Sequence, residues 1–171
     1  MEKRPIVIDA GPLLTYLALQ YLNSNDTPKA RRDQILREIR PGSPIDEPEQ
    51  ERLRQLLRQP AFTTAHVIAE VLKLREKSLL SRIAGEFRRH SLDILIGGAI
   101  REVPCPIEEM CREKDFRQLV CDYGIADAGL IFAAYSMRAL VLTDDRRLFR
   151  SYSVHQDYVI ELLDNYLRQP A

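Results

Sequence analysis

The sequence predicts an α/β protein with a short, mostly parallel sheet. Residues 5–9 (PIVID) and 139–143 (ALVLT) are short apolar runs, the pattern of parallel strands that are buried on both faces. Segments with apolar residues at helical spacing lie between them, and such alternation of strands and helices is typical of α/β folds. A length of 171 residues suits a single domain, 1–171, with a full hydrophobic core.

Helices are expected after the first strand and again from about residue 63. The break at Gly11-Pro12 is followed by an apolar helical stretch over 13–22. Thr63-Thr64 supplies a cap for a second helix, and a further helix is expected to end near residue 96, before a pair of glycines. The apolar face of the second helix consists of Val67, Ile68, Val71, Leu72 and Leu74.

A charged insertion at about 25–60 separates these helices. Residues 28–40 and 49–59 carry a few apolar residues at helical spacing among many charges, and a proline-rich loop joins them. We expect a helical hairpin that stands partly away from the core, as a mobile arm that reaches RNA or a partner protein. A solvated helical pair that packs on a second copy of the chain is the alternative. The basic residues of the arm are Arg31, Arg32, Arg37, Arg40, Arg52, Arg54 and Arg58.

The second half of the chain alternates between strands and helices. Prolines at 104 and 106 close one expected strand, and Gly124 separates two expected helices. Asp144-Asp145 then starts a short helical turn. The expected elements are a strand at 99–103, helices at 107–121 and 125–137, and strands at 139–143 and 151–154, with a last helix at 159–168.

The composition excludes a strongly basic protein. The chain carries 25 basic and 25 acidic residues, so it has no overall attraction to nucleic acid. Arginine is far commoner than lysine, which suits a phosphate-rich partner but equally fits a compositional bias of the source genome. Three scattered cysteines argue for a reducing compartment, and the N-terminal apolar stretch is too short for a signal peptide. No apolar run approaches the ~20 residues of a membrane span, so we expect a cytoplasmic protein without membrane association.

Acidic residues follow the two clearest strands. Asp9 ends the first strand, and Asp145 lies just past the strand at 139–143. In parallel α/β sheets ligands bind outside the carboxyl ends of the strands, so these two acids are expected at one edge. Taken singly, Asp9 also fits a turn before Gly-Pro, and Asp144 and Asp145 also fit helix capping.

Two further acids lie on apolar helices. Glu70 falls beside Val67 at the edge of an apolar helix face, and Asp127 sits within the apolar helix at 125–137. A carboxylate on a buried face is costly unless a cation compensates it. An arginine partner and a metal ion are the two alternatives for Asp127.

A cluster of several carboxylates has one chemical use above others. The carboxylates repel one another, and Mg²⁺ and Mn²⁺ prefer such oxygen ligands. Bound metal ions acidify water into a nucleophile and stabilise a leaving oxygen, which is the chemistry of phosphodiester hydrolysis. The four acids therefore predict a metal-dependent nuclease.

The order and spacing of four segments resemble those of the PIN-domain nucleases, including the VapC-type toxin ribonucleases. Each segment is weak evidence alone, but each carries one of the four acids at a strand end or on a helix. The segments are VIDAGPLL (7–14), TTAHVIAEVL (63–72), YGIADAGLIFAA (123–134) and VLTDDRRLF (141–149).

The resemblance implies a three-layer α/β/α fold and Mg²⁺- or Mn²⁺-dependent cleavage of RNA by an endoribonuclease. The family's catalytic and metal-binding acids match Asp9, Glu70, Asp127 and Asp145, with Thr143 as a supporting hydroxyl. Asp144 is a neighbour of the fourth acid, Asp145, that could share or replace its role, and the sequence does not choose between the two.

Partners are also implied by the resemblance. Arg146 and Arg147, next to the fourth acid, are expected to contact substrate phosphates, although exposed and inert side chains are the alternative. Many relatives form homodimers, and a toxin–antitoxin pair would add an antitoxin protein. The insertion at about 25–60 is longer than in compact VapC-like toxins. The alternative from another class is a catalytically silent PIN-like module that binds RNA or acts as a scaffold.

Overall fold

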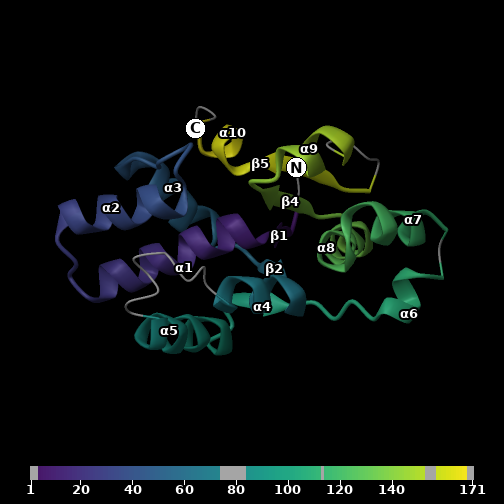
Figure 1. Cartoon of the computed structure of the whole chain (residues 1–171), viewed down its shortest axis with the longest axis horizontal. Helices are drawn as coiled ribbons and strands as arrows, with labels where there is room; N and C mark the ends of the chain where they lie inside the picture. Colours follow the sequence, from purple (N-terminus) through teal and green to yellow (C-terminus); the bar gives the residue numbers. More distant parts are fainter. Residues whose placement is uncertain (1–3, 74–83, 113, 153–156, 169–171) are drawn as a thin grey trace.

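A five-stranded, all-parallel sheet forms the centre of the molecule, which confirms the predicted fold class (Figure 1). The computed structural model describes residues 4–73, 84–112, 114–152 and 157–168. The strand order across the sheet is β3-β2-β1-β4-β5. The strands are β1 (Ile6–Ile8), β2 (Ala61–Thr63), β3 (Ile100–Glu102), β4 (Leu140–Thr143) and β5 (Val159–Leu162).

Helices cover the sheet on both sides and complete three layers. Figure 1 places α1, α2 and α3 on one side of the sheet and α7 and α8 on the other. Val7 and Val141, in the two central strands, are fully buried between these layers. The helices are α1 (Ala10–Ser24), α2 (Lys29–Ile39), α3 (Glu47–Leu56), α4 (Ala65–Lys73), α5 (Ala84–Ile96), α6 (Ile107–Met110), α7 (Lys114–Tyr123), α8 (Ile125–Met137), α9 (Arg146–Tyr152) and α10 (Leu163–Arg168).

β1 occupies the centre of the sheet, between β2 and β4. The chain leaves β1 toward β2 on one side and later returns to add β4 on the other side. Ile6, Val7 and Ile8 pair in parallel with Leu140, Val141 and Leu142. The carboxyl ends of β1 and β4 are therefore neighbours at the point where the strand order reverses, which is where ligands bind in such sheets.

Two strands differ from the sequence prediction. β2 occupies residues 61–63, where no strand was expected before the helix at 63. The last strand lies at 159–162 rather than 151–154, because Ser151 and Tyr152 belong to α9 and residues 153–154 lie outside the described residues. The predicted helix at 159–168 is therefore only α10, since its first four residues pair with β4.

The predicted helices differ mainly at their ends. The helix predicted at 107–121 is divided into α6 and α7, because the single turn that follows Pro106 ends at Cys111. The helix that begins at Ala65 is described as far as Lys73, and Leu74 of its predicted apolar face lies outside the described residues. The predicted end of a helix near residue 96 is confirmed by α5.

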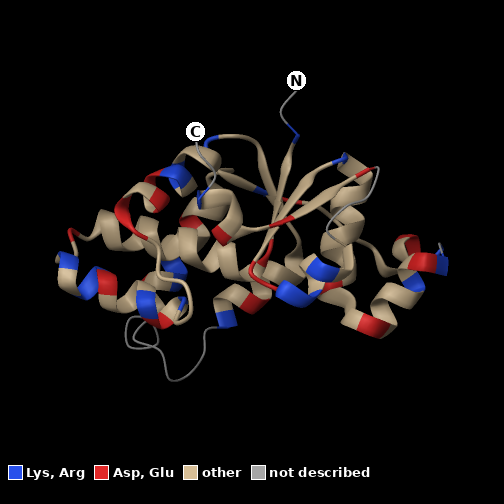
Figure 2. Cartoon of the chain, turned by 90° about the horizontal axis from the view of Figure 1, so that it is seen from above, with Lys and Arg blue, Asp and Glu red and all other residues tan. Residues whose placement is uncertain are grey.

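The insertion packs on the core and does not stand away from it, so the predicted separate arm is wrong. Ile35 of α2 and Leu53 of α3 are 2% and 1% exposed and belong to the same apolar cluster as the sheet. Arg52 also donates from Nη1 to the Leu167 carbonyl of α10 at 2.5 Å. Figure 2 shows acidic and basic residues interspersed along these helices rather than one basic stripe. The apolar spacing seen in the sequence is therefore the buried face of the hairpin.

Truncation of the hairpin's buried face should destabilise the whole domain. We expect Leu53→Ala to lower the free energy of unfolding by about 2–5 kcal/mol, because it leaves a cavity in the shared core. Leu92→Ala is the matched control, since Leu92 on α5 is 43% exposed. Urea unfolding of both variants measures the difference, and equal losses would contradict a shared core.

In the part of the chain that the structure describes, no helix is long and apolar enough to cross a bilayer.

Candidate active site

Asp9 is held at the junction between β1 and α1. Its backbone N–H donates to the Leu142 carbonyl of β4 at 2.9 Å. Its Oδ1 accepts the Ala10 N–H at 2.6 Å, so Asp9 caps α1. The predicted position of Asp9 at the carboxyl end of a strand is confirmed, whereas the alternative of a turn before Gly-Pro is wrong, because α1 already begins at Ala10.

Thr143 connects Asp9 to the turn after β4. This side chain is fully buried, and its hydroxyl donates to Oδ2 of Asp9 at 2.5 Å. The same Oγ1 accepts the Asp145 N–H at 2.9 Å. One hydroxyl therefore fixes the distance between the first acid and the backbone of Asp145.

Asp145 caps the helix that follows. Its Oδ1 accepts the backbone N–H groups of Arg147 and Leu148 at 2.6 and 3.2 Å. The capping alternative from the sequence is thus confirmed for Asp145. The cap fixes the carboxylate at the start of α9, and its negative charge still reaches Asp127.

Asp127 lies in the first turn of α8, beside an arginine. Its side chain is 23% exposed, and its Oδ2 is 3.8 Å from Nη2 of Arg147. The Arg147 guanidinium lies 4.6 Å from the centre of the Tyr123 ring, a cation–π contact. Because Arg147 is 62% exposed, this long ion pair is weak and leaves the carboxylate accessible.

Glu70 projects from α4, the helix after β2. The residue is exposed, whereas its neighbours Val67 and Val71 are buried. This arrangement confirms the predicted place of Glu70 at the edge of an apolar face. Its charge reaches both Asp9 and Asp127 and raises the pKa of each carboxyl, after the larger effect of burial.

The charges of neighbouring predicted acids act on two of the four, Asp9 and Asp127. Burial raises the pKa of Asp9 to about 6, although the Thr143 and Ala10 hydrogen bonds oppose the shift. The charges of Asp127 and Glu70 add to the rise. Burial also raises the pKa of Asp127, and the charge of Asp145 is the next cause. These shifts are typical of carboxylates that are gathered at a functional site.

Asp144 is engaged elsewhere. Its Oδ2 lies 2.6 Å from Nη1 of Arg40, which is buried at the end of α2. Burial raises the pKa of the Asp144 carboxyl, and the adjacent guanidinium works against that rise. The prediction that Arg40 is available to bind RNA is therefore wrong. The two neighbouring aspartates differ in that Asp144 pairs with a cation, whereas Asp145 caps α9.

Gly11 allows the Asp144 carboxylate to approach α1 closely. A Cβ at this position would overlap Asp144 Oδ2 and would lie 3.1 Å from the Asp144 Cβ and Cγ. Gly11→Ala should therefore displace the turn after β4 and destabilise the protein by about 1–3 kcal/mol, although alanine favours helices.

Gly85→Ala is the matched control for this substitution. Gly85 also lies in a helix, and an added Cβ there meets nothing within 4 Å. We expect the control to be neutral or to stabilise the protein by up to about 1 kcal/mol. Thermal unfolding compares the two, and a Gly11→Ala variant as stable as Gly85→Ala would contradict the close approach.

The donor set suits a hard divalent cation. All four acids supply carboxylate oxygens, which Mg²⁺ and Mn²⁺ prefer. Among residues 4–73, 84–112, 114–152 and 157–168, no three His, Cys, Asp or Glu side chains lie close enough together to hold one ion. The chemistry of the donors therefore fits, and the carboxylates would have to turn toward a shared ion.

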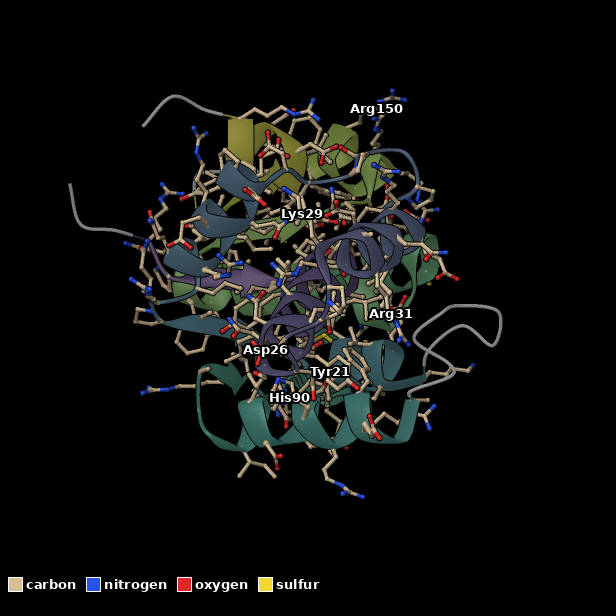
Figure 3. The ribbon with its side chains drawn as sticks, turned by 90° about the vertical axis from the view of Figure 1, so that its left-hand side faces the viewer. Tyr21, Asp26, Lys29, Arg31, His90 and Arg150 are labelled. Carbon is tan, nitrogen blue, oxygen red and sulfur yellow. The ribbon has the colours of Figure 1, made fainter. Side chains whose placement is uncertain are left out.

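A pocket lies far from these acids. Tyr21, Arg31 and Glu86 help to line a pocket of about 340 Å³ at the carboxyl end of α1. Figure 3 shows Tyr21 and Arg31 on this side of the molecule, with His90 of α5 beside Tyr21. Because Tyr21 follows Asp9 by 12 residues, about 18 Å of helix separate this pocket from Asp9.

Comparisons with known proteins add no assignment. No protein-family model and no curated protein matches this chain.

Three residues at the site were not singled out for their roles from the sequence. Arg40 pairs with Asp144 across 104 positions, Gly11 makes space for that pair, and Tyr123 supports Arg147. For Tyr123, the sequence offers one indication of a place at the site, because it lies four residues before Asp127 in the segment 123–134. Nothing in the sequence distinguishes Arg40 from the other arginines of the insertion.

Proposed function

We propose that this chain is a metal-dependent endoribonuclease of the PIN type. The observation that carries the proposal is that the charges of Asp127 and Glu70 act on Asp9, and those of Asp145 and Glu70 act on Asp127, although the four acids come from separate segments. Asp9 and Asp145 stand at the adjacent carboxyl ends of β1 and β4. Carboxylates that repel one another favour binding of a divalent cation, and a bound divalent cation suits phosphodiester hydrolysis.

The acids have distinct roles in the proposed reaction. Asp9, Asp127 and Asp145 would hold Mg²⁺ or Mn²⁺, directly or through water, and Glu70 would assist. The ion would supply an acidified water and charge stabilisation for the leaving oxygen. Glu70 is exposed and orients the attacking water or takes its proton. The water oxygen would add to phosphorus while its proton is removed, and the bond to the 3′ oxygen would break. The 3′ oxygen would then take a proton from solvent, which leaves a 5′-phosphate and a 3′-hydroxyl.

Arg147 is the better candidate for a phosphate contact. It lies over the Tyr123 ring beside Asp127, so its guanidinium is already directed at the site. A planar guanidinium suits the oxygens of a flanking phosphate. Arg146 is exposed at the start of α9 and would contribute charge alone.

The cellular setting is part of the proposal. We propose a cytoplasmic enzyme that acts as a homodimer on RNA, with the toxin of a toxin–antitoxin pair as one form of that role. A catalytically silent RNA-binding or scaffold module is the second candidate. The absence of a closed three-ligand cluster within the described ranges favours this second candidate.

Metal-dependent cleavage tests the proposal directly. We expect end-labelled single-stranded RNA to be cut in the presence of Mn²⁺ and to survive when EDTA removes the metal. Gel analysis of the products should find 5′-phosphate ends, and single-stranded DNA of the same sequence tests the choice of RNA. Calorimetry with Mn²⁺ separates the two candidates, because RNA binding without Mn²⁺ binding or cleavage would leave only the silent module.

A further inference from the structure

A single buried arginine joins three separate parts of the chain behind the acids. Arg40 follows α2, and its side chain is 5% exposed. Its Nε donates to the Ser43 carbonyl at 3.0 Å and its Nη2 to Oδ1 of Asp164 on α10 at 2.5 Å. Its Nη1 donates to Oδ2 of Asp144 at 2.6 Å. The guanidinium thus connects the insertion, α10 and the turn between β4 and α9.

The turn that Arg40 holds is the one that carries the fourth acid. Asp144 precedes Asp145 directly, and its carboxylate packs against Gly11 in the first turn of α1. Asp9 caps that same helix. Thr143 secures the turn to Asp9 from one side, and Arg40 secures it to the insertion from the other.

A buried guanidinium with two carboxylates is a costly way to gain stability alone. Apolar residues of similar volume are often equally stabilising at such positions, and in some proteins buried ion pairs serve to fix geometry. Arginine is suited to this position because its planar fork can hold two carboxylates at once in fixed directions.

We propose that Arg40 is a positioning residue of the acidic site. It occupies the Asp144 carboxylate and holds the turn after β4, so that Asp145 rather than Asp144 acts as the fourth acid. The insertion is then part of the active site's support. This inference rests on the proposed nuclease function for its link to metal binding.

Two substitutions on one ion-pair network test the proposal. Arg40→Met removes the contact with the turn, whereas Asp164→Asn weakens a contact of the same guanidinium on the α10 side. We expect Arg40→Met to weaken Mn²⁺ binding by about 10- to 100-fold, the usual effect of losing a group that orients a metal ligand. Asp164→Asn should lower thermal stability and leave the Mn²⁺ dissociation constant unchanged. Calorimetry on the full chain measures both constants.

Hydrogen exchange of the Asp145 amide provides a readout without metal. This N–H donates to Thr143, so its protection reports the order of the turn. We expect faster exchange in Arg40→Met than in Asp164→Asn. If Arg40→Met does not fold, Arg40→Lys replaces it, because lysine keeps the charge without the planar fork.

The possible results separate the two proposals. Unchanged exchange and unchanged Mn²⁺ affinity in Arg40→Met would overturn the positioning role. Equal effects of Arg40→Met and Asp164→Asn would overturn it too, because the network would then be merely structural. A parent chain that binds no Mn²⁺ overturns the proposed function, and the exchange comparison then still decides whether Arg40 holds the turn.

Discussion

Replacement of Asp9 by asparagine is expected to abolish Mn²⁺-dependent RNA cleavage while the fold is retained. The amide has the shape of the carboxylate, so it can still accept the Ala10 N–H and contact Thr143. It lacks the charge that would hold a divalent cation. The rate should fall by more than about 100-fold, since even groups that only orient a metal ligand contribute about 10- to 100-fold.

The control for this loss is an acid away from the site. Asp93 lies exposed on α5, and Asp93→Asn should cleave RNA at the parental rate. Initial rates at saturating Mn²⁺ compare the three proteins, and circular dichroism checks their folds. An Asp9→Asn variant that cleaves as fast as the parent would remove Asp9 from the proposed mechanism.

The metal-free protein should lose stability as the pH rises from about 4 to about 6. Burial raises the pKa of Asp9 from 3.8 to about 6, so within this window the folded chain holds a proton that the unfolded chain has lost. The unfolded state then binds fewer protons, and the free energy of unfolding falls with pH. The shift corresponds to about 3 kcal/mol, all of it lost above the folded pKa. Burial of Asp127 acts in the same direction.

Asp9→Asn should remove the part of this pH dependence that comes from Asp9. We expect the metal-free variant to be more stable than the parent at about pH 7.5 and nearly equal to it at about pH 4. Urea unfolding at the two pH values measures the effect, with Asp93→Asn as the control. Added Mn²⁺ should stabilise the parent at the higher pH and leave Asp9→Asn unaffected. A parent that gains stability between pH 4 and 6 would contradict the raised pKa.

The sequence was sufficient for the central strands and insufficient for the short ones. β1 and β4 are continuous apolar runs that end in acids, so both their type and their shared edge could be predicted. β2 has three residues, too few to display a period, and it runs directly into the cap of α4. β5 and α10 are contiguous, and the apolar residues of the two together have the spacing of a single helix face. The end of the strand at Leu162 therefore cannot be recognised in the sequence.

The candidate site was predictable for its acids and not for their partners. Asp9, Glu70, Asp127 and Asp145 were found because each stands at a strand end or interrupts an apolar helix. The difference between Asp144 and Asp145 depends on Arg40, and only the packing of the insertion brings that arginine to the turn. The hairpin's arginines look alike in sequence, and burial distinguishes one of them.

The pairing of β1 with β4 has a consequence for the chain during its synthesis. Ile6 of β1 pairs with Leu140 of β4, so β1 cannot form this pairing until the chain has been synthesised past Leu140. A nascent chain that ends before Thr143 contains Asp9 and Glu70 but lacks both the hydroxyl that fixes Asp9 and the fourth acid. If the chain cuts RNA, a fragment released from a ribosome that stalls before Asp145 lacks the complete set of acids. The strand order thus delays assembly of the acid set until Asp145 has been synthesised.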